Sequence, residues 1–110
     1  MFDSVHATMT VTDLDRAERW YETLFERGPD TRPMAGLVEW RVGEADGVQV
    51  FADPTRAGRS GCVLGETDLD GAAARLRQAG VAHDGVAPGG GRRILVLSDP
   101  DGNQLVLIGD

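Results

Sequence analysis

The chain contains one pattern twice. Its segment Thr-Asp-Leu-Asp-Arg-Ala at 12–17 reappears as Thr-Asp-Leu-Asp-Gly-Ala at 67–72, a separation of 55 residues (12 to 67). The same separation relates Asp46 to Asp101 and Gln49 to Gln104. Landmarks that repeat in one register indicate two copies of one unit, at about 1–55 and 56–110. A duplicated unit restricts the chain to folds that pack two similar halves together.

The first copy alternates between strand and helix signals. Apolar and polar residues alternate at its start, as they do in a half-buried strand, and apolar residues then recur at helical spacing. A loop rich in Gly, Asp and Glu favours a hairpin after the helix. The expected elements are a strand at 5–11, a helix at 14–25 capped by Thr12 or Asp13 and ended by Gly28, strands at 37–42 and 48–52, and a short strand near 31–33.

The second copy follows the same plan with small differences. Its expected elements are a strand at 62–65, a helix capped near Thr67 and ended by Gly80, a strand at 81–86, a flexible loop at 87–91, and a hairpin of strands at 92–98 and 104–108. Each half is thus predicted to be βαβββ, and the fold class to be α+β. We expect a single domain, 1–110, in which the two modules form a curved, cup-shaped eight-stranded mixed sheet with the helices on the outer face. Its concave face is the expected site of function.

Composition limits the class of protein. A chain of 110 residues that is 41% hydrophobic and 26% charged is typical of one globular domain. No apolar stretch is long enough for a membrane span, and the N-terminal residues lack the pattern of a secretory signal, so we expect a cytoplasmic protein that has no membrane partner. The net charge of −7 argues against nucleic acid. Cys62, the only cysteine, has no partner for an intrachain disulfide.

Several motifs together point to a known family. Val5-His6, the segment 13–17, Trp20-Tyr21 and the Asp-Pro-Asp-Gly-Asn turn at 99–103 resemble the opening strand and helix and the closing hairpin of the vicinal oxygen chelate superfamily. This superfamily includes glyoxalases, bleomycin-resistance proteins and dioxygenases. The resemblance implies the paired βαβββ fold. It also implies a homodimer with the cavity at or near the interface, which we expect independently because the edges of an open sheet are usually covered.

The resemblance also locates the metal positions of the family's enzymes. These enzymes hold their ion with His or Gln on each opening strand and Glu near the end of each unit's last strand. The corresponding positions here are His6, Gly61 or its neighbour Cys62, Phe51 or in an alternative alignment Gln49, and Val106. Valine and glycine have no donor group, so His6 and Gln49 are the only two plausible ligands. We therefore expect no cofactor, with a divalent metal as the alternative.

Strand alternation predicts which side chains line the cup. If His6 faces the cavity, so do Thr8 and Thr10, and on the last strand of each unit the same reasoning selects Gln49, Gln104 and their second neighbours. The lining is mixed, apolar with a few hydrogen-bonding groups, which suits an organic ligand. The predicted ligand-binding residues are His6, Thr8, Gln49, Phe51, Cys62, Gln104 and Val106.

Three functions are compatible with this pattern. The first is metal-free binding of a small organic molecule, aromatic or cationic, as the resemblance implies for members that sequester antibiotics or metabolites. The second is a metal-dependent glyoxalase-like lyase, isomerase or dioxygenase in which His6 and Gln49 bind the ion with help from Cys62 or another residue. The third is a domain whose cup mediates protein contacts. No nucleophile elbow or phosphate-binding loop is present, and His83 is expected at the surface. Val106, which replaces a carboxylate, favours the first function.

Overall fold

The computed structural model describes all 110 residues. The chain folds as two βαβββ modules, which confirms the predicted fold class. The first module contains β1 (His6–Val11), α1 (Leu14–Phe25), β2 (Thr31–Met34), β3 (Leu37–Val42) and β4 (Asp46–Ala52). The second contains β5 (Gly61–Gly65), α2 (Leu69–Gln78), β6 (Ala87–Gly89), β7 (Arg92–Ser98) and β8 (Gln104–Gly109).

Both helices begin with an aspartate cap. The side chain of Asp13 accepts a hydrogen bond from the backbone N–H of Arg16, and that of Asp68 accepts one from Gly71, so each satisfies a free amide of the first turn. The first cap is one of the two that the sequence allows, and the second lies one residue beyond Thr67. Helix α1 ends at Phe25, before the predicted stop at Gly28, because Glu26 takes a left-handed conformation.

The two sheets have the same strand order. It is β1-β4-β3-β2 in the first and β5-β8-β7-β6 in the second, with one parallel pair and two antiparallel pairs in each. His6 of the first opening strand corresponds to Gly61 of the second, 55 residues later. His6 pairs with Gly47 and Gly61 pairs with Gln104, so the closing strands correspond at a separation of 57 residues (47 to 104). The duplication is therefore real, with a two-residue change of register between its helix and its hairpin.

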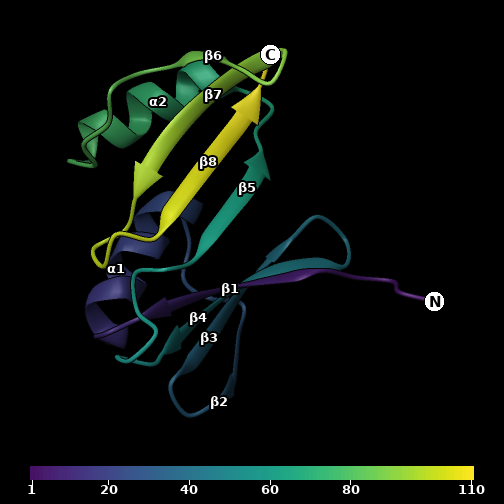
Figure 1. Cartoon of the computed structure of the whole chain (residues 1–110), viewed down its shortest axis with the longest axis vertical. Helices are drawn as coiled ribbons and strands as arrows, with labels where there is room; N and C mark the ends of the chain where they lie inside the picture. Colours follow the sequence, from purple (N-terminus) through teal and green to yellow (C-terminus); the bar gives the residue numbers. More distant parts are fainter.

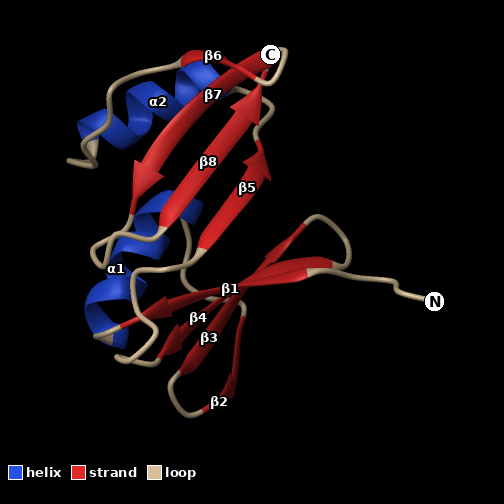
Figure 2. Ribbon diagram, in the orientation of Figure 1, coloured by secondary structure: helices blue, strands red, loops and turns tan.

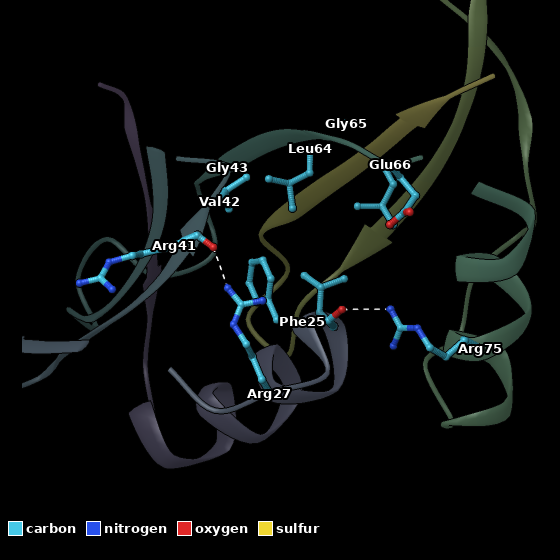
Figure 3. A pocket seen from close by; sticks show the side chains of 11 residues that line it. Phe25, Arg27, Arg41, Val42, Gly43, Leu64, Gly65, Glu66 and Arg75 are labelled. Carbon is cyan, nitrogen blue, oxygen red and sulfur yellow. Dashed lines mark hydrogen bonds between the residues drawn. The ribbon is translucent and has the colours of Figure 1, made fainter. Parts of the chain in front are cut away.

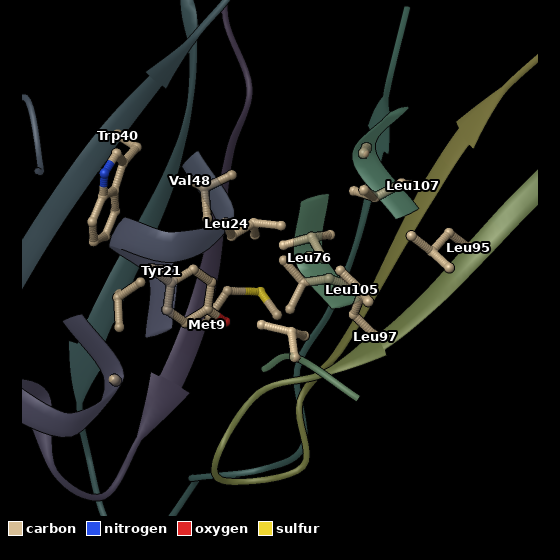
Figure 4. Close-up of a cluster of buried hydrophobic side chains, with 14 of the residues drawn as sticks. Met9, Tyr21, Leu24, Trp40, Val48, Leu76, Leu95, Leu97, Leu105 and Leu107 are labelled. Carbon is tan, nitrogen blue, oxygen red and sulfur yellow. The ribbon is translucent and has the colours of Figure 1, made fainter. Parts of the chain in front are cut away.

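Both sheets turn their helix-facing sides toward one core. Figure 4 shows Trp40 and Val48 of the first sheet on one side, Leu95 and Leu107 of the second on the other, and residues of both helices between them. All these side chains belong to a single hydrophobic cluster. The faces not covered by helices therefore lie on the outside of the shared core and do not face each other.

The expected eight-stranded cup is not present in one chain. Figures 1 and 2 show β1 and β5 close together at one end and diverging from there. At the near end the backbone N–H of Thr10 donates to Ser60 Oγ, but no ladder joins the two strands. The prediction of one continuous sheet is wrong at this level, because burying both apolar helix-facing sides in one core turns the two sheets apart.

The segment at 81–86 also differs from the prediction. It forms no strand, and the second strand of the module is the three-residue β6, inside the stretch expected to be a loop. Gly80 and Gly85 both have positive φ, which breaks an extended conformation. His83 then fixes the segment, since Nδ1 accepts from the backbone N–H of Gly85 and Nε2 bonds the carbonyl of Ala73 on α2.

A buried polar cluster fastens the second hairpin to the first module. Asp99 accepts the hydroxyl hydrogen of Tyr21 at 2.8 Å, and burial together with that carboxylate raises the pKa of Tyr21. Asn103, fully buried, donates to the carbonyl of Thr10 at 2.7 Å and accepts from the backbone N–H of Ser60. The Asp-Pro-Asp-Gly-Asn turn is thus a junction between modules as well as a turn.

Candidate functional site

Each sheet has one face without a helix. We call the face of the first sheet, which carries His6, Thr8, Leu37, Glu39, Gln49 and Phe51, the first open face. We call the face of the second sheet, which carries Gly61, Val63, Ile94, Val96, Gln104, Val106 and Ile108, the second open face. Strand alternation places these residues opposite the buried side chains of the shared core.

The first open face is organised around Glu39. One carboxylate oxygen, Oε2, accepts from Gln49 Nε2 at 2.8 Å and lies 3.0 Å from His6 Nδ1. Thr8 Oγ1 donates to Gln49 Oε1 at 3.4 Å, so the amide of Gln49 is held at both ends. Only 12% of the Glu39 side chain is exposed, against 39% for His6. The result is a connected polar cluster with a largely buried carboxylate at its centre.

A glycine makes room for this cluster. A Cβ atom at Gly47 would lie 2.8 Å from His6 Nδ1 and 3.3 Å from Glu39 Cδ. The imidazole of His6 therefore crosses the sheet over Gly47 to reach the carboxylate of Glu39. Any other residue at this position would push the ring away.

The second open face is apolar and exposed. Val63 on the edge strand β5 is 64% exposed and Val96 on the inner strand β7 is 40% exposed, so this face presents large aliphatic side chains to solvent. Part of this face is hollowed into a cavity of about 400 Å³, whose lining is Ala82, His83, Asp84, Gly85, Ala87, Ile94, Val96 and Ser98. The segment at 81–86, held by His83, is therefore a wall of this cavity. His83 was expected only as a surface residue, and its two hydrogen bonds could not be read from the sequence.

Corresponding positions of the two open faces differ in chemistry. Gln49 pairs with Thr8 and Glu39 in the first sheet, while Val106 pairs with Val63 and Val96 in the second. The structure thus favours the alignment of Gln49, and not Phe51, with Val106. A polar row of the first module is a row of three valines in the second.

Six of the seven predicted ligand-binding residues lie on the open faces. His6, Thr8, Gln49 and Phe51 share the first, whereas Gln104 and Val106 share the second, so one chain does not bring them together. Cys62 lies on the helix-facing side, because it pairs with the buried Leu105 and packs against the core. Its partial burial raises the pKa of the thiol.

Two further positions depart from the sequence analysis. Thr10, expected to line the cavity, is buried because its hydroxyl donates to the carbonyl of Arg56 at 2.8 Å under the segment at 53–60. Glu39 was missed. A charged residue between the apolar Val38 and Trp40 of a hairpin strand was the available signal, since alternation turns it to the open side.

The chain does not reproduce the donor set of the superfamily's metal enzymes. His6, Glu39 and Gln49 supply donors from the first sheet alone, and the second sheet offers Gly61 and Val106 at the matching positions. The structure contains no group of three or more His, Cys, Asp or Glu side chains arranged for a metal. The residues present therefore do not fit the metal centre of these enzymes.

A second hollow lies between the modules on the helix side, away from both open faces. It has a volume of about 250 Å³, and Figure 3 shows Phe25, Arg27, Leu64 and Arg75 around it. Arg27 donates to the carbonyl of Arg41, and Arg75 donates to the carbonyls of Thr23 and Leu24 at the end of α1. Arg75 thus joins the second module to the first, whereas Arg27 bonds within the first module.

The fold is similar to that of several solved structures. A glyoxalase/bleomycin resistance protein from Catenulispora acidiphila matches with a TM-score of 0.86 and 24% identity, covering 96% of each chain. A bleomycin-binding protein in complex with bleomycin matches at 0.81 and 23%, covering 100% of this chain and 99% of the other. TnmS3, an antibiotic-binding protein from Streptomyces, matches at 0.84 and 24%, covering 99% and 96%.

No family model and no curated protein matches the sequence. At these identities the likeness shows the fold, and the chain has the fold of the vicinal oxygen chelate superfamily. The resemblance deduced from the motifs is confirmed at that level. No helix of the structure is long and apolar enough to cross a bilayer.

Proposed function

We propose that this protein is a cytoplasmic, metal-free binding protein for a small organic molecule, and that it acts as a homodimer. The observation that carries the proposal is the contrast between the open faces. One holds a hydrogen-bonded polar cluster around Glu39, and the other exposes Val63, Val96 and a cavity. A pocket with an apolar wall and a few fixed polar groups is the usual form of a small-molecule site.

A dimer would bring the two faces together. Within one chain they lie on the outside of a shared core, and β1 and β5 are edge strands of their sheets. Exposed valines and open edges favour contact with a second copy, in which the first open face of one protomer covers the second open face of the other. Sedimentation at micromolar concentration should show a dimer. A monomer under those conditions would contradict this arrangement.

Ligand binding can be measured by thermal unfolding. Since one structural neighbour is in complex with bleomycin, we would use metal-free bleomycin and a panel of aromatic cations as probes. Free ligand at about one hundred times Kd adds about 2.7 kcal/mol of stability, which for a domain of this size raises Tm by about 10 °C. Phe51→Ala should reduce the shift through loss of contact area. No shift with any probe would count against the proposal.

One observation favours the enzyme alternative. A hydrogen bond from His6 Nδ1–H to Glu39 would leave Nε2 as the free lone pair, the arrangement that orients histidine for a metal or for proton transfer. Metal analysis of protein purified without added metal distinguishes the two functions. We expect no stoichiometric Zn²⁺, Ni²⁺ or Fe²⁺ and little effect of chelator on Tm. One tightly bound ion per chain that is lost in His6→Ala would establish the enzyme alternative.

A further inference from the structure

The carboxylate of Glu39 has half of its hydrogen-bonding capacity unused. Both donors that reach it, from Gln49 and His6, bind the same oxygen, Oε2. No group of the chain donates to Oε1, which nevertheless keeps contact with solvent. One oxygen of a largely buried carboxylate on the first open face is thus left free to accept a hydrogen bond from a ligand.

Glu39 also lacks a permanent counter-ion. Its only ion-pair partner is His6, which carries a charge only when protonated, and no arginine lies within 4.0 Å of it. Other carboxylates in contact with the sheets do have one: Glu18 pairs with Arg32 at 2.7 Å and Asp70 with Arg93 at 2.9 Å. A carboxylate withdrawn from water without a fixed positive partner is costly, and a cationic ligand would offset that cost.

Arg41 does not fill this role. It follows Glu39 by two positions on the same face of β3, but its side chain is exposed and forms no ion pair. The surroundings of Glu39 on the open side are otherwise uncharged, with Leu37 and Phe51 in the next row of the sheet. An organic group attached to the cation would therefore find apolar surface beside the carboxylate.

We propose that Glu39 is the specificity-determining residue of the first open face, and that it selects organic cations, with a guanidinium or ammonium group on Oε1 and an apolar group against Phe51. This inference rests on the proposed function and identifies its ligand class. His6 and Gln49 act as positioning residues that fix Oε2, and Gly47 gives His6 the room to do so.

The test compares two probes of the same shape, a phenylalkyl guanidinium and the urea built on the same skeleton. Both are titrated into isotope-labelled protein while the backbone amides of His6, Gln49 and Phe51 are followed by NMR. A charged hydrogen bond to Glu39 should make the guanidinium bind about tenfold more tightly than the urea. In Glu39→Gln, which keeps the shape and an acceptor, this preference should disappear.

The controls separate this inference from the proposed function. Glu44→Gln removes the same charge from the exposed hairpin loop and should keep the tenfold preference, as should Arg41→Gln. Equal binding of both probes by the unsubstituted protein would overturn the inference but leave the proposed function intact. A preference that survives in Glu39→Gln would also overturn it, by assigning selectivity to another residue. Binding of neither probe would contradict both.

Discussion

The two modules have the same topology, but the side chains on their open faces differ in chemistry. In the first, the row Thr8, Gln49 and Glu39 is polar and hydrogen-bonded, while in the second the corresponding row is entirely valine. Their helix-facing sides, in contrast, are equally apolar and share one core. The sides that determine folding are thus alike in the two copies, and the sides exposed to a ligand differ.

The paired positions at the start of the opening strands also differ. In the first module the ring of His6 lies over Gly47, whereas in the second Gly61 lies opposite Gln104 and only the backbone carbonyl of Gln104 comes near it. The hairpin turns differ more. Asp46 accepts one exposed hydrogen bond from the backbone N–H of Val5, whereas the turn at 99–103 makes the buried junction between modules.

The largest expected effect comes from breaking the junction of the second module. Asn103→Ala would leave the buried N–H of Ser60 without its acceptor, and would remove one donor from the carbonyl of Thr10, which keeps the N–H of Gly58, and one from Asp99 Oδ2, which keeps the hydroxyl of Tyr21. We expect a loss of about 3 kcal/mol of unfolding free energy by denaturant titration. Asp46→Ala in the first module should cost under about 1 kcal/mol. Equal costs would show that the two turns contribute alike.

Making the first open face resemble the second should stabilise the free protein. Glu39→Val introduces the residue found at the corresponding position, Val96, and removes a largely buried carboxylate. Because a buried charge is costly, we expect a gain of about 1 kcal/mol in unfolding free energy at neutral pH, together with loss of cation binding. A loss of stability of the same size would mean that Glu39 serves the fold.

The glycine pairs predict a smaller and local effect. Gly47→Ala should displace the ring of His6 from Glu39 at a cost of about 1 kcal/mol or less, since the ring can move toward solvent. NMR signals of the His6 ring nitrogens should then show a mixture of tautomers. Gly61→Ala is the matched control, because its Cβ would meet only the carbonyl of Gln104 at 3.7 Å. An unchanged tautomer in Gly47→Ala would contradict the assigned role.

The smallest expected effect concerns ion pairs that both modules possess. The hydrogen bond from Arg32 holds the pKa of Glu18 below its usual value, and that from Arg93 does the same for the pKa of Asp70. Stability from such pairs is present above the unfolded pKa of the carboxyl and is lost as pH falls through the lowered folded pKa. Arg32→Gln and Arg93→Gln should each raise the pKa of the paired carboxyl in an NMR titration. A pKa that does not move would show that the pair does not persist in solution.

Much of the architecture was predictable from local pattern. The repeat, both helices and the four hairpin strands follow from periodicity and from capping residues such as Asp13. The prediction of a strand at 81–86 was wrong. The conformation of this segment depends on the hydrogen bond from His83 to α2 and on the positive φ of Gly85, and the hydrogen bond is a tertiary contact. Cys62 was predicted to line the cup as the neighbour of Gly61, the residue that corresponds to His6. Neighbouring residues of a strand lie on opposite faces of the sheet, so a shift of one residue placed Cys62 on the wrong face.

The sequence by itself determined the two modules and which residues can face away from the helices, since these depend on periods of two and 3.6 residues. Only the tertiary structure decided that the two sheets share one core and turn their open faces outward. It alone brought Glu39 to His6 and Gln49, which lie 33 and 10 residues away along the chain. Such contacts depend on strand register and on the space left by Gly47, and no local pattern encodes either.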